Sequence, residues 1–139
     1  MKLGFVCVHN AGRSQMAAAF AERERAARGR EDVEIVTGGT DPAAEIHPEV
    51  REAMAEVGID LTGREPQAVD SATLESCDVV ATMGCSTLSL DADVDVHDWA
   101  LPDPQGASPE RVREIREMVR ERVDGLFEDL VGGETDASD

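Results

Sequence analysis

Cys7-Val-His-Asn-Ala-Gly-Arg-Ser14 lies between two short segments of different character. Before it stands the apolar run Leu3-Gly-Phe-Val-Cys-Val8, and after it the alanine-rich run Gln15-Met-Ala-Ala-Ala-Phe20. A short apolar run bounded by a loop predicts a buried strand, and the apolar residues of the second run predict one face of a helix. The order of strand, tight loop and helix predicts the start of an α/β domain.

The loop between this strand and helix has the features of an anion-binding site. Its backbone N–H groups, together with the helix N-terminus, attract negative charge. Arg13 adds a planar set of donors that fits a tetrahedral oxyanion. The same positive field favours the thiolate form of Cys7, so we expect its sulfur to attack phosphate or a phosphate mimic. The predicted oxyanion-binding residues are Val8, His9, Asn10, Ala11, Gly12, Arg13 and Ser14.

A structural interpretation of the same residues is a buried strand cysteine followed by an ordinary first-turn arginine. The Cys-x5-Arg spacing alone does not exclude it, because that spacing arises easily by chance. The context disfavours it, since the motif follows a predicted strand, opens a predicted helix, contains Gly12 and ends in Arg-Ser.

The chain is unusually acidic for its size. Its 139 residues suit one domain, and they include 30 acidic residues against 13 basic ones, for a net charge of −17. Lys2 is the only lysine, and the acidic residues are spread over the whole sequence. This composition excludes a basic face for nucleic acid. It indicates a halophilic protein, because a high charge favours solubility in concentrated salt, where repulsion is screened.

The sequence also sets expectations for location and metals. No segment approaches the roughly 18 apolar residues of a membrane span. The chain enters its first strand directly after Met1, without a signal peptide, so we expect a cytoplasmic protein. Three cysteines in such a protein indicate catalytic or redox thiols. There is no Cys-x2-Cys pair and no pair of histidines at metal spacing, so we expect no metal and no other cofactor.

Strands and helices alternate along the rest of the chain. This alternation predicts a parallel sheet with helices on both faces, in a single catalytic domain over residues 1–131 followed by an acidic, disordered tail over 132–139. Loops that follow parallel strands meet at one sheet edge, so Cys7, Cys85 and the loop Leu101–Gly106 should lie together. The strands are expected at 2–8, 33–36, 78–83 and 94–96, and the helices at 13–28, 47–57, 70–76 and from Ser108 to about 131.

The motif and a later dipeptide resemble a known family. Cys-x5-Arg-Ser after the first strand, with Asp103-Pro104 near the C-terminus, is similar to the low-molecular-weight protein tyrosine phosphatases, over residues 2–131. The segment from Val8 to Ala17 resembles the thiol-coupled arsenate reductases that share this fold. The phosphatases usually have proline where this chain has Gln15. The resemblance implies a three-layer fold with four strands in the order 2-1-3-4.

The resemblance also implies roles for the site residues. Cys7 is the nucleophile, Arg13 and the loop amides hold the anion, and Ser14 donates a hydrogen bond to the thiolate. Asp103 matches the general acid that protonates the leaving oxygen. Its neighbour Asp98 competes for this role, although we interpret it as a surface or capping residue. Two further expectations come from the residues themselves, namely that Asn10 bonds to its own loop backbone and that His9 faces solvent.

The choice between reductase and phosphatase depends on a second thiol. In a reductase a second thiol attacks the sulfur of the cysteine–arsenate adduct, and arsenite leaves. Thr82-Met-Gly-Cys85 resembles the segment that carries this thiol, although Ser89 stands where a further cysteine is often found, and Cys85 also fits a small buried residue. An external small thiol or a thioredoxin-like protein is the other possible reductant. Cys77 precedes the third predicted strand, roughly 20 Å from the catalytic edge, so we interpret it as structural.

The sequence favours the reductase. It has no tyrosine and one tryptophan, Trp99, and Gln105 rather than an aromatic residue follows Asp103-Pro104, so an aromatic wall for a phenol ring is not expected. We therefore predict a monomeric arsenate reductase that binds arsenate or phosphate. The alternatives are a phosphatase of phosphotyrosine or small phosphomonoesters, acting through a phospho-Cys7 intermediate, and an oxyanion-binding or redox-sensing module without turnover.

Overall fold

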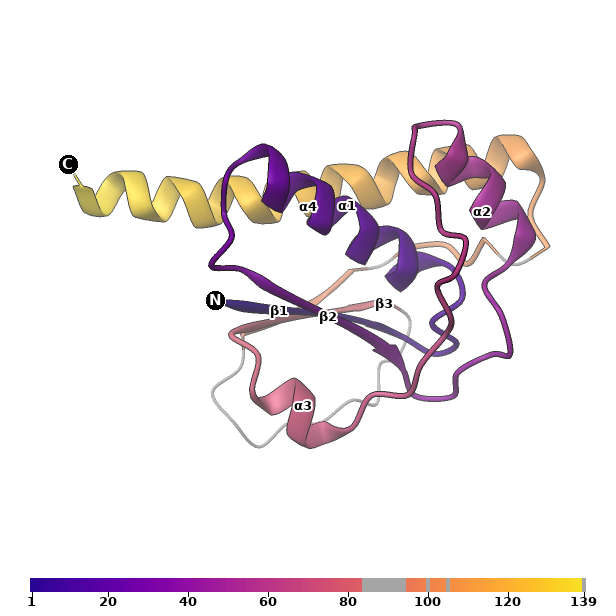
Figure 1. The fold of residues 1–139 in the computed structure, drawn as a ribbon, viewed down its shortest axis with the longest axis horizontal. Helices are drawn as coiled ribbons and strands as arrows, with labels where there is room; N and C mark the ends of the chain where they lie inside the picture. The colour runs from indigo at the N-terminus through magenta and orange to yellow at the C-terminus, as the bar shows by residue number, and fades with distance from the viewer. Residues whose placement is uncertain (84–94, 100, 105, 139) are drawn as a thin grey trace.

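Four parallel strands form one sheet in the order β2-β1-β3-β4 (Figure 1). The computed structural model describes residues 1–83, 95–99, 101–104 and 106–138, and for residues 71 and 130–138 it describes the backbone alone. The predicted strand order and α/β class are confirmed. The strands are β1 (Lys2–Cys7), β2 (Glu34–Gly39), β3 (Val79–Met83) and β4 (Asp95–Asp98).

The two central strands read as continuous apolar runs because both of their faces are covered. All of β3 and all but the first residue of β1 are buried, whereas the edge strands β2 and β4 are largely exposed or half-buried. Central strands of parallel sheets have this pattern because helices pack on both sides. The register places Cys7 beside Gly39 of β2 and beside Met83 of β3, so these strand ends meet at one edge.

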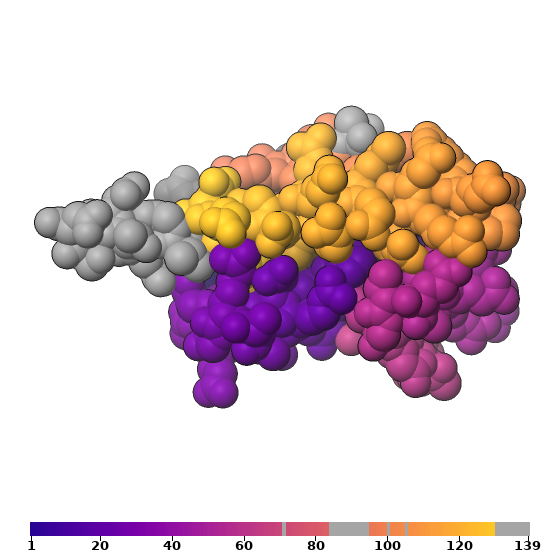
Figure 2. Space-filling view, turned by 90° about the horizontal axis from the view of Figure 1, so that it is seen from above, coloured from indigo at the N-terminus to yellow at the C-terminus, as the bar shows by residue number. Residues whose placement is uncertain are grey.

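The helices cover the two faces of the sheet unequally. Figure 1 shows α1 (Arg13–Ala27), α2 (Pro48–Ala55) and α4 (Pro109–Ser138) on one face and α3 (Ser71–Glu75) on the other. Residues 14–21 of α1 are all buried, because their small alanine side chains fit between the sheet and α4. Seen from above, α4 lies along both α1 and α2 (Figure 2). This packing fixes the start of α1, and with it the loop before it.

Buried apolar positions at helical spacing hold α4 against this face. Apolar residues spaced three and four apart form a stripe on one side of α4, and this spacing predicts a buried helix face. Its members Val112, Ile115, Val119 and Val123 are fully buried. The Ser108 hydroxyl accepts a hydrogen bond from the Arg111 N–H at 3.2 Å, so Ser108 caps the start of α4.

Several boundaries differ from those expected. β2 continues to Gly39, three residues beyond the predicted end at Val36, because its last residues pair with the end of β1. β4 includes His97 and Asp98. The helix α4 runs to Ser138, past the predicted end near residue 131. The division of the chain at residue 131 and the disorder expected beyond it stay predictions. Among the described residues, no helix is both long enough and apolar enough to cross a membrane.

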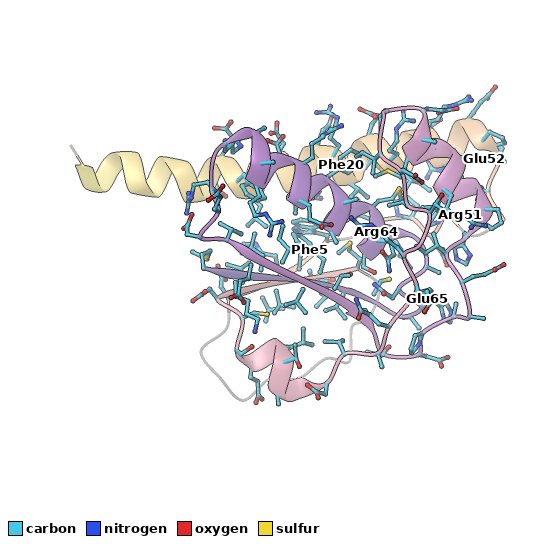
Figure 3. All side chains as sticks on the ribbon, viewed as in Figure 1. Phe5, Phe20, Arg51, Glu52, Arg64 and Glu65 are labelled. Carbon is cyan, nitrogen blue, oxygen red and sulfur yellow. The ribbon has the colours of Figure 1, made fainter. Side chains whose placement is uncertain are left out.

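All four aromatic residues of the chain lie in the core. Phe5 and Phe20 lie between α1 and the sheet (Figure 3), and Phe127 is fully buried on α4. Trp99 is 5% exposed and packs against Phe5, with ring centroids 5.9 Å apart. The aromatic side chains therefore serve packing.

A second, smaller apolar cluster lies under α3. It contains Val6, Leu74, Val80 and Cys77, whose sulfur lies 3.2 Å from the position that a Cβ on Gly4 would take. Burial raises the pKa of the Cys77 thiol. Cys7 belongs to the larger cluster on the opposite face. The structural interpretation of Cys77 fits this position.

Arginines connect α2 to α4 across their acidic surfaces. The guanidinium of Arg113 contacts the Glu56 carboxylate at 2.8 Å, and that of Arg116 contacts it at 2.9 Å. Hydrogen bonds from Arg113, and then from Arg116, hold the pKa of Glu56 at about 2, against an ordinary value of 4.5.

Substitution of Gly39 by alanine should destabilise the fold and disturb the loop after β1. A Cβ at this position would lie 2.5 Å from the Val8 carbonyl oxygen and 3.0 Å from the Asn10 nitrogen, both of which are backbone atoms. We expect Gly39→Ala to lower the free energy of unfolding by about 1–3 kcal/mol, the usual cost of overpacking. The matched control is Gly125→Ala on α4, where nothing lies within 4 Å, and it should raise stability by about 0.5–1 kcal/mol. Equal effects of the two changes in denaturant titrations would contradict the contact.

Substitution of Glu56 by glutamine should remove a stabilising contribution that depends on pH. Because its folded pKa is depressed, Glu56 stabilises the fold above its unfolded pKa of about 4.5, and this contribution is lost as pH falls toward 2. The melting temperature of Glu56→Gln should lie below that of the wild type at neutral pH and approach it in acid. Salt should reduce the difference. Glu52→Gln on the same helix removes the same charge and serves as control; an equal loss there would contradict the assignment.

Candidate active site

The carbonyl groups of the loop after β1 bind outward to the backbone of residues 40–47. Four of them accept hydrogen bonds at 2.8–3.2 Å: Cys7 from Thr40, Val8 from Asp41, His9 from Ala43 and Ala11 from His47. With these carbonyls bonded to residues 40–47, the opposite side of the loop backbone is available to the Cys7 side chain. The Asn10 N–H donates to the Cys7 sulfur at 3.2 Å. This arrangement forms a cradle for an anion without any charged side chain.

At the other side of the loop, Gly12 and Arg13 contact the segment 101–104. The Arg13 guanidinium donates to the Leu101 carbonyl at 2.9 Å, and another of its nitrogens lies 4.0 Å from the Asp103 carboxylate. The ring of Pro104 lies only 2.8 Å from the position that a Cβ on Gly12 would take. Glycine is therefore needed at position 12 for close approach of the segment. The side chain of Asp103 is half exposed, at 51%, and its carboxylate lies on the side of the Arg13 guanidinium.

Buried polar side chains hydrogen-bond to one another beneath the loop backbone, on the side of the protein interior. Asn10 adopts the left-handed conformation, with a φ of 51°, and is fully buried. Its amide nitrogen donates to the Ser14 hydroxyl at 2.7 Å and to the Thr37 hydroxyl at 2.9 Å. Its amide oxygen accepts from the Gln15 side chain at 2.9 Å and from the Gln67 N–H at 3.0 Å. Asn10 thus fixes the loop as expected, but the predicted partners were wrong, because its side chain binds these groups and not its own loop backbone.

Backbone groups settle the direction of these hydrogen bonds. The Thr37 hydroxyl donates to the Phe5 carbonyl at 2.9 Å, so toward Asn10 it can only accept. The Gln67 N–H can only donate, so it faces the Asn10 amide oxygen. The Asn10 amide nitrogen therefore faces Ser14 and occupies the hydroxyl as an acceptor. The Ser14 proton can then point to the Cys7 sulfur, 2.8 Å away, and it must do so when Cys7 is a thiolate, because a thiolate can only accept.

The two histidines near the loop contact the backbone around it. Nδ1 of His9 lies 3.0 Å from the Asp41 carbonyl, and since a carbonyl can only accept, Nδ1 carries the proton. The His9 side chain is half-buried and therefore partly open to solvent. His47 is the residue before α2, and its ring lies 3.5 Å from the Cβ position of Gly12.

Most of the predicted site residues lie together at this edge. Ser14 contacts the sulfur of Cys7, which is 3% exposed, and Asp103 lies beside Arg13 at the end of the same loop. Asp98 is the last residue of β4 and accepts a hydrogen bond from the Thr82 hydroxyl at 3.2 Å, which fits the surface role expected for it. Cys85, Ser89 and Gln105 lie outside the described residues.

Sequence reasoning missed two members of the site, Thr37 and Gln15. The Thr37-Gly-Gly39 sequence at the end of β2 is a signal for Thr37, because paired glycines permit close approach of the backbone to the loop. Gln15 was noted only as a departure from proline. Among the described residues, no three side chains of His, Cys, Asp or Glu converge in a way that could hold a metal ion.

Comparisons with known proteins agree with this geometry. Residues 2–134 match the family described as low molecular weight phosphotyrosine protein phosphatase. A Halobacterium salinarum protein with the provisional name arsenate reductase is 62% identical over 93% of this chain and 92% of its own. A glutaredoxin arsenate reductase of Synechocystis is 34% identical over 91% of this chain and 95% of its own. The solved structure of a thioredoxin-dependent arsenate reductase from Corynebacterium glutamicum superposes with a TM-score of 0.80 at 31% identity, over 95% of this chain and 62% of that one.

Proposed function

The chain belongs to the low molecular weight phosphotyrosine protein phosphatase family, and we propose that within it the protein is a thiol-dependent arsenate reductase of the cytoplasm. One observation carries the choice of substrate. All four aromatic side chains of the chain are buried in the core, so none is available to hold a phenol ring beside the cradle. The cradle itself fits a small tetrahedral oxyanion. Its relatives named as arsenate reductases support the same choice.

The first step of the proposed reaction forms a bond between sulfur and arsenic. The Cys7 thiolate, held by the Ser14 hydroxyl and the Asn10 N–H, attacks arsenate in the cradle. Arg13 and the loop amides hold the remaining oxygens. Asp103 donates a proton to the departing oxygen, which leaves as water. Its position beside Arg13, with a half-exposed carboxylate, supports this role.

The second step reduces the arsenic. A second thiol attacks the Cys7 sulfur, a disulfide forms, and the bond between sulfur and arsenic breaks. The electron pair of that bond stays on arsenic, so As(V) becomes As(III) and leaves as arsenite while a pair of thiols is oxidised.

The second thiol of the proposed reaction is Cys85 or an external one. Cys85 follows Met83 by two residues in the sequence, and Met83 pairs with Cys7 across the sheet. A small thiol or a thioredoxin-like protein is the alternative reductant. Cys77 does not qualify, because it lies near Gly4 on the other face, three strand residues from Cys7 along β1. This spacing, roughly 10 Å, is shorter than the roughly 20 Å expected from the sequence but still beyond disulfide reach. The strong net charge of −17 supports a monomer, since like-charged copies repel.

A phosphatase is the second candidate. In that case water resolves a phospho-Cys7 intermediate, and the same cradle and acid serve the reaction. The pairing of Arg13 with an acid on the opposite segment is compatible with both chemistries. The two candidates therefore differ in what they release and in whether thiols are consumed.

A single turnover without added thiol tests the proposed function. Fully reduced protein is mixed with arsenate in concentrated salt, and arsenite and free thiols are counted. We expect about one arsenite per chain with loss of a thiol pair if Cys85 resolves the adduct. Cys85→Ser should then require an added thiol, whereas Cys77→Ser should behave as the wild type. Phosphate should compete with arsenate. Absence of arsenite even with thiols or thioredoxin present, together with hydrolysis of a phosphomonoester, would identify a phosphatase instead.

Substitution of Asp103 by asparagine tests the general acid. The amide cannot supply the proton, so we expect turnover to fall by about 10²-fold or more. Inhibition by phosphate should be nearly unchanged, because Arg13 and the loop amides stay in place. Asp98→Asn removes the same charge from the neighbouring strand end and should leave turnover close to that of the wild type. An unchanged rate in Asp103→Asn would remove this residue from the mechanism.

A further inference from the structure

Gln15 is a large polar side chain that is almost completely buried. It is 1% exposed, and among the largest fully buried side chains in the described part of the chain it is the only polar one. A buried amide is costly unless its hydrogen bonds are made. Its amide nitrogen donates to the Asn10 amide oxygen at 2.9 Å and to the Glu65 carbonyl at 3.3 Å. Gln15 thus joins the loop to the segment 64–69, which passes the start of α1 (Figure 3).

The Glu65 carbonyl fixes the direction of the Gln15 amide. A carbonyl can only accept, so the nitrogen of the amide faces it, and the same nitrogen faces the Asn10 oxygen. The Asn10 oxygen then has two donors, Gln15 and the Gln67 N–H. This pair of donors keeps the Asn10 nitrogen turned toward Ser14 and the Ser14 proton turned toward Cys7.

We propose that Gln15 is a positioning residue that keeps the Ser14 hydroxyl donating to the Cys7 sulfur, although it touches neither Cys7 nor the bound anion. An acceptor at position 15 would repel the Asn10 oxygen and favour the flipped amide. In the flipped state the Asn10 oxygen faces Ser14, whose proton turns to it and away from Cys7. This inference rests on Cys7 being the nucleophile of the proposed function.

The titratable and charged groups near Cys7 are unchanged when Gln15 alone is substituted. Arg13 lies on its own loop, Asp103 stands on the segment across the cradle, and His9 and His47 lie beside the loop. None of them contacts Gln15 through any interaction described above. A change in Cys7 reactivity caused by the neutral Gln15→Met therefore passes through Asn10 and Ser14, whereas Gln15→Glu also adds a buried charge that acts on the Cys7 thiolate directly.

Alkylation of Cys7 by iodoacetamide over a pH series tests the proposal without arsenate. Modification is followed by mass spectrometry on the tryptic peptide Leu3–Arg13, which contains Cys7 alone. We expect Gln15→Glu to slow alkylation about tenfold below neutral pH, with the rates converging in alkali where every thiol ionises. Gln15→Met removes one donor and keeps the Gln67 N–H, so it should slow alkylation about threefold. Ala68→Glu adds a charge at an exposed neighbouring position and should change little.

The outcomes separate this inference from the proposed function. Equal alkylation profiles for Gln15→Glu and Ala68→Glu would overturn the role of Gln15. If Gln15→Glu does not fold, as judged by circular dichroism, an unchanged profile for Gln15→Met overturns it as well. If the wild-type Cys7 itself reacts no faster below neutral pH than Cys77 does in the unfolded chain, the nucleophile of the proposed function fails instead. A slower Gln15→Glu with parallel loss of arsenate turnover supports both.

Discussion

The outward hydrogen bonds from the loop carbonyls to residues 40–47 are the constraint on which the rest of this structure depends. They direct the loop carbonyls toward residues 40–47 and so leave the loop N–H groups for an incoming anion. They need the end of β2 to lie directly against the loop, and only glycine at position 39 allows that approach. The alanines at the start of α1 play the same part on the other side, since they let the helix sit close to the sheet and α4. Small residues therefore position the site, and polar ones complete it.

Much of the fold was predictable because it depends on local patterns. The apolar runs of β1 and β3, the stripe of α4 and the cap at Ser108 are each read within one segment. The anion-binding loop was predictable from Cys7 and Arg13 together with the strand before them, the helix after them and Gly12 between them. The partners of Asn10 were not, because Thr37 and Gln67 come from distant segments and meet the loop only through the sheet register. The extension of β2 was missed for the same reason, since paired glycines read as loop until a neighbouring strand pairs with them.

Arginine has a particular use in this acidic chain. Arg28 joins α1 to α4 through Glu24, Asp124 and Glu128, and Arg113 and Arg116 join α2 to α4 through Glu56. Exposed pairs of this kind contribute little singly. Here Arg28 stands between carboxylates of α1 and α4, and Arg116 stands between Glu56 and Glu117, so each separates carboxylates that would otherwise repel each other across the junction. The planar group can bind several carboxylates at once, which a single ammonium does less well. The near absence of lysine fits that arrangement.

The burial of Trp99 has a consequence for how the molecule can be observed. With no tyrosine in the chain, its intrinsic fluorescence comes from this one indole. The indole packs on Phe5 of the central strand, its backbone N–H binds the Thr82 carbonyl, and its own carbonyl binds the Leu101 N–H, two residues before Asp103. A shift of the segment 101–104 when an anion binds Arg13 would thus change the surroundings of the Trp99 indole, which is only two residues from Leu101, and with them its fluorescence. The chain carries its own optical reporter of the cradle, with no second emitter to obscure it.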